Sequence, residues 1–361
     1  MKASKRRWAR AAAWCLALAA GCSAPPTAQE TAERYSRELD GIDRAVAEAL
    51  KGFCAPREEW GPRFFQAGSG DPSPILIEQT LEVSSLAYAP RLLPRLAAEL
   101  AAAGRGGFSV FSGEDVPAGT LLLLEVPVAS DLVYRFDVFQ EVRGRLAVIV
   151  DDIGYSLAGR DLLLDLDLPL TLAVLPRLPY SARWDELAAA NGYEVILHFP
   201  MEAANPDLEI GPGGIRIDTG EEEIGKVLGE NLAALPHAVG CNNHMGSSFT
   251  VDEPAMKRLL ENLRSRGLFF VDSLTISGTA TVSAAEGTGV KLGRRDVFLD
   301  HVDTEEAIAE RFQAAQDLAL RRGTAVVIGH YRHLTLAFLH DRLKDVAERG
   351  IQVVPVSDLV E

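Results

Sequence analysis

The sequence has little of several features that would assign a function at once. Its 361 residues include 36 Lys and Arg against 51 Asp and Glu, and a formal charge of −15 repels phosphate backbones, so nucleic-acid binding is not expected. No GxGxxG or Walker motif follows a strand-like run, which argues against a nucleotide cofactor. After the first 22 residues no apolar run is long enough to span a bilayer. The composition, 47% hydrophobic and 24% charged, is that of a globular protein with a sizeable core.

Residues 1–22 have the pattern of a secretory signal. Basic residues precede the apolar run AAAWCLALAAG, which is too short to be a permanent membrane anchor. The run ends in LAAGCS, which resembles a bacterial lipobox with Cys22 as the acylated residue; Ala19 stands where leucine is usual, so cleavage without lipid is the alternative. We therefore expect an exported protein of the periplasm or envelope, anchored to a membrane through Cys22. Outside this leader only Cys54 and Cys241 remain, and no disulfide between them is indicated.

Patterns of polarity divide the rest of the chain into three segments. Residues 23–72 begin as a tether, APPT, and continue as the amphipathic helix ETAERYSRELDGIDRAVAEALKGF. Residues 73–143 predict a small α+β domain without evident chemistry. Residues 144–361 alternate helical patterns with short apolar runs, among them LAVIV, LTLAVL, YEVILH, AVGCN, LFFVD, VFLD, AVVIGH and IQVVPV. Seven or eight strands alternating with helices predict a parallel sheet, either closed as a barrel or open and doubly wound.

Side chains that could carry chemistry follow these runs. Acids or imidazoles come at the carboxyl ends of most of them: Asp151, Asp152, His198, His244, Asp272, Asp300, His301 and His330. In a parallel α/β fold the carboxyl ends of the strands meet at one rim, where functional groups collect. Carboxylates and imidazoles gathered there are typical of a metal-centred hydrolytic site.

The adjacent acids Asp151 and Asp152 are unfavourable side by side at the end of a core strand unless a cation binds there. A divalent ion held by one carboxylate and two neutral imidazoles keeps positions open for water, lowers the pKa of that water and polarises a substrate carbonyl. One aspartate could ligate the ion while its neighbour takes the proton from the attacking water. We expect zinc, although carboxylate ligands also accept other divalent ions.

The motifs IVDDIG, GYEVILHFPME, GCNNHMGS, FFVDS, GTGVK and VIGH occur in this order over residues 145–361. Together they resemble the divergent polysaccharide deacetylase family, a distant branch of the NodB-like carbohydrate esterases. The resemblance implies a deformed (β/α) barrel of about seven strands, a divalent metal, and deacetylation of an N- or O-acetylated glycan such as peptidoglycan. By the pattern of the wider superfamily, Asp151 resembles the catalytic base and His330 the general acid, and Asp152 and His198 resemble metal ligands.

The sequence departs from the superfamily pattern in two places. Glu202 replaces the second histidine of the H-x-x-x-H metal motif, so the third ligand is Glu202 or His244, and we favour His244 because imidazole suits zinc. The arginine-proline motif has no clear counterpart, although Arg294 or Arg295 could serve. These departures favour a second hypothesis, a non-catalytic glycan-binding or regulatory protein that keeps the barrel without turnover. Hydrolysis of another acyl or amide bond at the same site is a third.

Two further polar residues have two interpretations each. Asp272 could orient a ligating histidine, or it could cap the helix that follows it. Asn243 could donate a hydrogen bond to an oxyanion, or it could shape its own loop.

Overall fold

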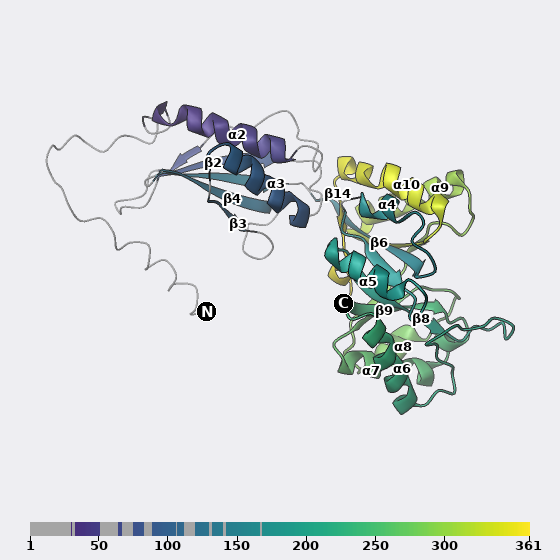
Figure 1. Cartoon of the computed structure of the whole chain (residues 1–361). Helices are drawn as coiled ribbons and strands as arrows, with labels where there is room; N and C mark the ends of the chain where they lie inside the picture. The colour runs from purple at the N-terminus through teal and green to yellow at the C-terminus, as the bar shows by residue number, and fades with distance from the viewer. Residues whose placement is uncertain are drawn as a thin grey trace.

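The described part of the chain forms two β-sheets, one of five strands and one of nine (Figure 1). The computed structural model describes residues 30, 33–50, 64–66, 75–82, 89–105, 107–111, 120–129, 132–139, 142–166 and 168–361. The predicted signal segment 1–22 with Cys22, the start of the tether and Cys54 lie outside these residues. Cys241 is buried and free.

The smaller sheet has the strand order β1-β2-β5-β4-β3, in which β2 and β5 run parallel and the other pairs antiparallel. Its elements are α2 (Ser36–Leu50), β1 (Phe64–Gln66), β2 (Ile75–Glu82), α3 (Ala89–Ala102), β3 (Ser109–Phe111), β4 (Thr120–Ala129) and β5 (Leu132–Phe139). The sequence pattern assigns the first helix to a tether apart from the small domain. The structure instead packs its apolar stripe, Leu39, Ile42 and Val46, into one core with α3, β4 and β5.

The larger sheet has the order β11-β10-β9-β8-β7-β6-β13-β12, and β14 pairs with the first half of β6. Its strands are β6 (Gly144–Ile153), β7 (Thr171–Val174), β8 (Glu194–Met201), β9 (Ala238–Met245), β10 (Phe269–Asp272), β11 (Leu292–Arg294), β12 (Val297–Phe298), β13 (Thr324–His330) and β14 (Ile351–Val354). Every pair is parallel. The edge strands β11 and β12 are separated only by Arg295 and Asp296, so the sheet must curl until its edges lie close together. The predicted deformed barrel is confirmed, with nine strands in place of about seven. Eight of the strands coincide with the eight apolar runs of the sequence, and the ninth, β11, is too short to show an apolar pattern.

Helices connect these strands and cover the outside of the barrel. They are α4 (Arg160–Leu164), α5 (Ser181–Ala190), α6 (Glu221–Ala234), α7 (Glu253–Ser265), α8 (Thr281–Ala285), α9 (Glu305–Arg322) and α10 (His333–Arg342), with short 3₁₀ segments η4 (Phe249–Val251), η5 (Leu343–Arg349) and η6 (Val356–Asp358). Local sequence fixes the starts of two of the long ones, α7 and α9. Asp252 accepts a hydrogen bond from Ala255 N at the start of α7, and Thr304 accepts one from Ala307 N at the start of α9.

Alternate residues of the barrel strands face two different cores. On β6, Leu146, Val148 and Val150 pack with the helices, whereas Ala147 and Ile149 face the barrel interior. The same period of two on the other strands fills the interior with Ala173, Ile196, Phe269, Val271, Val326 and Ile328. Continuing the alternation toward the carboxyl ends puts polar side chains on the interior side of four strands, at Asp151, His198, Asn242 and His330, and at Ser273, directly after β10. The fold therefore brings chemically active side chains together at the carboxyl rim.

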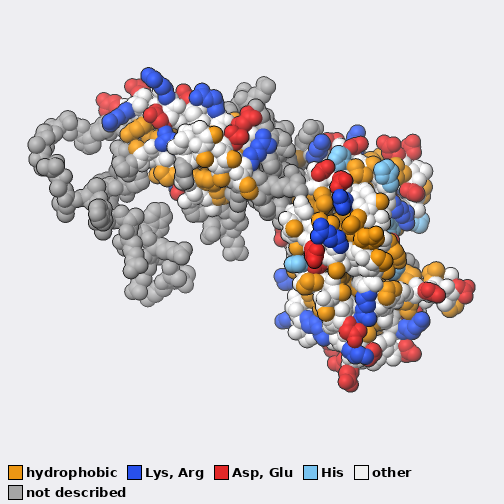
Figure 2. Space-filling model, in the orientation of Figure 1, with side chains coloured by type: hydrophobic (Ala, Val, Ile, Leu, Met, Phe, Trp, Pro, Cys, Tyr) orange, Lys and Arg blue, Asp and Glu red, His pale blue; other side chains and the backbone are white. Residues whose placement is uncertain are grey.

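The surface carries charges of both signs. Figure 2 shows Lys and Arg interspersed with Asp and Glu over the described residues of the face drawn. Among the described helices, none has both the length and the apolar character needed to cross a bilayer.

Candidate functional site

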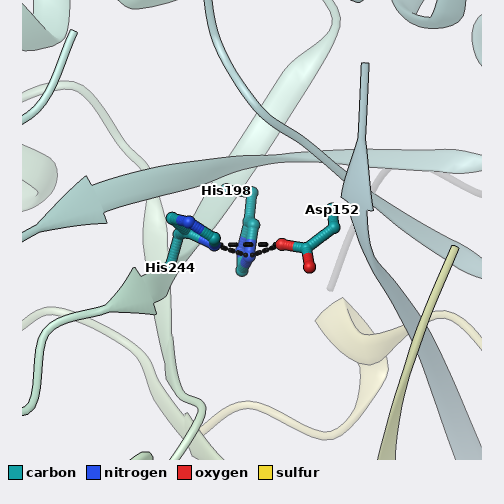
Figure 3. A group of neighbouring side chains, drawn as sticks. All are labelled: Asp152, His198 and His244. Atoms are coloured by element: carbon teal, nitrogen blue, oxygen red, sulfur yellow. Dashed lines mark hydrogen bonds and ion pairs between the residues drawn. The ribbon is translucent and has the colours of Figure 1, made fainter. Parts of the chain in front are cut away.

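Asp152, His198 and His244, in the carboxyl-terminal halves of β6, β8 and β9, point toward one another (Figure 3). Asp152 Oδ1 lies 3.1 Å from His198 Nε2 and 2.9 Å from His244 Nδ1, and the two imidazole nitrogens are 3.1 Å apart. Ligands bound to one zinc ion at about 2.0–2.1 Å in a tetrahedral site are roughly 3.3 Å apart. The three atoms would thus need to separate by only a few tenths of an ångström, so this donor set fits a divalent metal. The group includes His244 and does not include Glu202.

A left-handed backbone at Asp152 lets two neighbouring carboxylates serve the same rim. In a regular strand, Asp151 and Asp152 would point to opposite faces. Asp152 instead has φ 63°, and the pairing of β6 with β7 is irregular between Val150 and Ile153. Both carboxylates consequently reach His198, with Asp151 Oδ1 3.8 Å from its Nδ1. Aspartate tolerates this conformation better than most residues, and such strained positions cluster at functional sites.

The two carboxylates differ in burial and in pKa. The side chain of Asp151 is 4% exposed, and burial raises its pKa although the charge of His198 and a hydrogen bond from Asn242 act the other way. The side chain of Asp152 is 32% exposed. Burial also opposes its ionisation, but hydrogen bonds from His198 and His244 hold the pKa of Asp152 well below its usual range. Asp152 therefore suits the binding of a cation, and Asp151 is the more basic group.

His198 is the buried member of the ligand group. Burial lowers its pKa, but the charge of Asp151 and the hydrogen bond to Asp152 outweigh burial and raise the pKa to about 9. In the metal-free protein at neutral pH, His198 is thus in its protonated, positively charged form and lies between the two acids. A histidine ligand must be neutral, so metal binding at this site would release that proton.

His330 faces Asp152 from β13, with its Nε2 3.9 Å from Asp152 Oδ2. Fully buried Asp300 fixes its ring: Asp300 Oδ1 contacts His330 Nδ1 at 2.8 Å, and Oδ2 accepts from His330 N at 2.8 Å and from the Thr335 hydroxyl at 2.7 Å. Phe298 packs edge-on against the imidazole, with ring centroids 5.0 Å apart. Nδ1 is thus engaged, and Nε2 is left to act toward the site. No motif or spacing in the sequence distinguishes Asp300 from the other strand-end acids.

Asp300→Asn should lower the pKa of His330. Burial lowers this pKa, but the hydrogen bond and the charge of Asp300 outweigh burial and raise it above its usual value. The associated stabilisation of the fold is fully present below the unfolded pKa of about 6.5 and is lost as the pH rises through the folded pKa. NMR titration of the ring signals in metal-free protein measures the shift. His237 pairs with Asp185, away from this substitution, so its ring signals should be the same in Asp300→Asn and in the parent at each pH. An unchanged pKa of His330 would mean that Asp300 does not control its protonation.

Glu202 and Asp272 are engaged in loop structure. Glu202 Oε2 accepts a hydrogen bond from Ile217 N at 2.9 Å, which secures the segment that follows β8. Asp272 accepts from Leu274 N at 2.9 Å and from the Thr279 hydroxyl at 2.7 Å. Asp272 therefore caps its own loop. The side chains that hydrogen-bond to Nδ1 of His198 and of His330 are instead Asn242 and Asp300.

Asn243 and Arg295 also support loops of the rim. Asn243 accepts from Ser273 N and donates to Met245 O, both at 2.8 Å, so it shapes the loop, as in the second of its two interpretations. Arg295 donates to Ser273 O at 2.6 Å and to Leu274 O at 2.8 Å. Its guanidinium also lies over the Phe298 ring, 4.8 Å from the centroid. The exposed Arg294 ends β11.

A curled parallel sheet whose carboxyl rim carries paired aspartates and convergent imidazoles defines a deformed (β/α)-barrel protein with a candidate metal site at that rim. The sequence profile described as divergent polysaccharide deacetylase matches residues 148–360, more than half of the chain, and the chain belongs to this family. The predicted family is confirmed.

Its relatives include proteins of unassigned activity. The uncharacterized protein YibQ of Escherichia coli (strain K12) is 34% identical over 217 residues, which are 60% of this chain and 67% of the relative. An uncharacterized protein of Haemophilus influenzae is 30% identical over 221 residues, 61% of this chain and 78% of the relative. The crystal structure of uncharacterized protein ATU2773 from Agrobacterium tumefaciens C58 matches with a TM-score of 0.57 at 25% identity, covering 60% of this chain and 89% of that one.

Proposed function

We propose that this protein is a metal-dependent hydrolase of the cell envelope that removes acetyl groups from an N- or O-acetylated glycan, with peptidoglycan or an exported polysaccharide as the expected substrate. The observation that carries the proposal is the convergence of three metal-ligating atoms, from Asp152, His198 and His244, beside two groups that could move protons. Membership of the divergent polysaccharide deacetylase family supports the acetylated glycan.

Asp152, His198 and His244 would hold the ion. One carboxylate and two imidazoles suit zinc, and three protein ligands are the number found in catalytic zinc sites that keep a position open. When bound there, the ion would lower the pKa of a water and polarise the acetyl carbonyl.

Asp151 and His330 would move the protons. Asp151, the more basic carboxylate, would take a proton from the attacking water as the new bond to the acetyl carbon forms. His330, whose Nε2 lies 3.9 Å from Asp152 Oδ2, would give a proton to the amine or alcohol as the bond between that group and the acetyl carbon breaks. The raised pKa of His330 favours the protonated form that this task needs. The products would be acetate and the free amine or alcohol.

The leader pattern supports export. With Cys22 acylated, the chain would be held at an envelope membrane, and with ordinary cleavage it would be released to the periplasm. Either place would give it access to cell-wall glycans.

A second candidate is a non-catalytic glycan-binding protein on the same fold. It is favoured by the contacts of Glu202 and Arg295, the positions considered for the missing superfamily motifs. Glu202 binds Ile217 N, and the guanidinium of Arg295 binds the carbonyls of Ser273 and Leu274. Both side chains thus support loops of the rim, a task that a protein without catalytic turnover would also need.

Elemental analysis of the purified protein, coupled to an acetate-release assay on peptidoglycan and acetylated oligosaccharides, separates the two. A hydrolase should carry about one divalent ion per chain and release acetate, and a chelator should stop this release until zinc is restored. A protein that binds these glycans and releases no acetate with zinc added would be the binding protein instead.

A further inference from the structure

Asn242 connects the two neighbouring aspartates through His198. It is fully buried on β9, in register with His198 on β8. Asn242 Oδ1 lies 2.8 Å from His198 Nδ1, and its Nδ2 donates to Asp151 Oδ1 at 2.8 Å and to Ser273 Oγ at 3.2 Å. The other nitrogen of His198 contacts Asp152 at 3.1 Å. Since Asp151 and Asp152 are consecutive, these contacts close a ring of four residues.

The amide group suits this place because it accepts at one end and donates at the other. Its oxygen accepts the Nδ1 proton of His198. When His198 is neutral, as a ligand must be, its Nε2 lone pair is then free to bind an ion between Asp152 and His244. Its NH2 group has two protons, one for Asp151 and one for Ser273. The reverse orientation would set the amide oxygen against the Asp151 carboxylate and the NH2 group against the Nδ1 proton, so the contacts permit one orientation only.

We propose that Asn242 is a positioning residue that couples the metal-binding half of the site to its base. It selects the His198 tautomer that can bind an ion through Nε2, and with the same amide it holds Asp151 in place. The inference rests on the proposed function, because it assigns Asn242 a task within that site. A carboxylate at this position would still accept from His198 but would repel Asp151, so a single substitution can separate the two tasks.

Two variants test the two halves. Asn242→Leu has a similar volume and neither hydrogen bond, and it should weaken Zn²⁺ binding by about 10- to 100-fold, the loss expected when a ligating histidine is no longer oriented. Asn242→Asp should keep Zn²⁺ affinity close to that of the parent. It should nevertheless lose acetate release by on the order of 100-fold, because Asp151 is displaced. Zn²⁺ affinity is measured by competition with a chromogenic chelator, and folding by circular dichroism.

Asn231→Leu is the matched control. Asn231 is also fully buried, accepts from Arg177 Nε at 3.0 Å and donates to Gly213 O at 2.8 Å, but it contacts no imidazole or carboxylate of the site. Its replacement should cost stability and leave Zn²⁺ affinity unchanged.

Four results would count against the inference. Equal Zn²⁺ affinity of the parent and Asn242→Leu would reject the positioning of His198, and full acetate release by Asn242→Asp would reject the positioning of Asp151. Both leave the proposed function intact, provided the parent binds zinc. A parent that binds no zinc rejects the proposed function together with the inference. If Asn242→Leu does not fold, Asn242→Asp remains as the test. Zn²⁺ affinity and acetate release that fall by the same factor in Asn242→Asp would then show that the two tasks of Asn242 cannot be separated.

Discussion

Asp152→Asn should remove the bound metal and leave the fold intact. Asp152 is the anionic member of the ligand group, and its Oδ1 lies within hydrogen-bonding distance of both imidazoles. Loss of a residue that only orients a metal ligand lowers metal affinity by up to about 100-fold. Loss of a ligand itself should cost more, so Asp152→Asn should lower Zn²⁺ affinity by more than about 100-fold. Asparagine has the same shape and, like aspartate, tolerates the left-handed φ of 63° at this position. Strain should therefore not confuse the result, as it would with alanine.

Zinc content after dialysis tests whether Asp152→Asn loses the metal. Thermal unfolding of the metal-free protein tests whether the fold is intact. Asp161→Asn is the control, since it removes one carboxylate charge from α4 at a side chain that is 80% exposed. Asp161→Asn should keep the parent's zinc content. Equal zinc content in Asp152→Asn and the parent would exclude Asp152 as a ligand. The ion, if present, would then have to be bound elsewhere.

The parallel barrel and the location of its site could be predicted because both depend on short-range pattern. Apolar runs such as LAVIV mark strands, and period-two alternation determines which of their residues face the interior. The carboxyl ends of parallel strands meet at one rim. Residues near the ends of different strands, including Asp152, His198 and His244, could therefore be expected from the sequence to meet there.

The partners of the imidazoles could not be predicted, because they depend on how strands lie beside one another. Asn242 faces His198 only through the register of β9 on β8, and this register is irregular between Val195 and Leu197. Asp300 reaches His330 from the segment after β12, a strand of two residues without a periodic pattern. Neither distance follows from separation along the chain. A single asparagine or aspartate at a strand end gives no sign of whether it caps a loop, as Asp272 does, or orients a histidine.

The same limit explains the helix at residues 36–50. Its amphipathic pattern predicts a helix correctly, but amphipathicity does not identify the surface that will cover the apolar face. In the structure Leu39 and Ile42 pack with α3 and the small sheet, so the helix is part of that domain's core rather than of a tether.

Asp151→Asn should keep the metal and lose turnover. Asp151 lies beside the ligand group, 3.8 Å from His198 Nδ1, and is not one of the three convergent ligands. Removing a general base costs about 10²- to 10⁴-fold in rate, which steady-state acetate release with zinc-loaded protein measures. Unfolding should not account for the loss of acetate release. Asparagine can still accept the hydrogen bond from Asn242. In addition, the folded pKa of the buried Asp151 carboxyl is raised, so its ionised form destabilises the folded protein, and asparagine removes that charge. The free energy of unfolding at neutral pH should therefore be unchanged or higher, and parental acetate release by this variant would show that Asp151 is not the base.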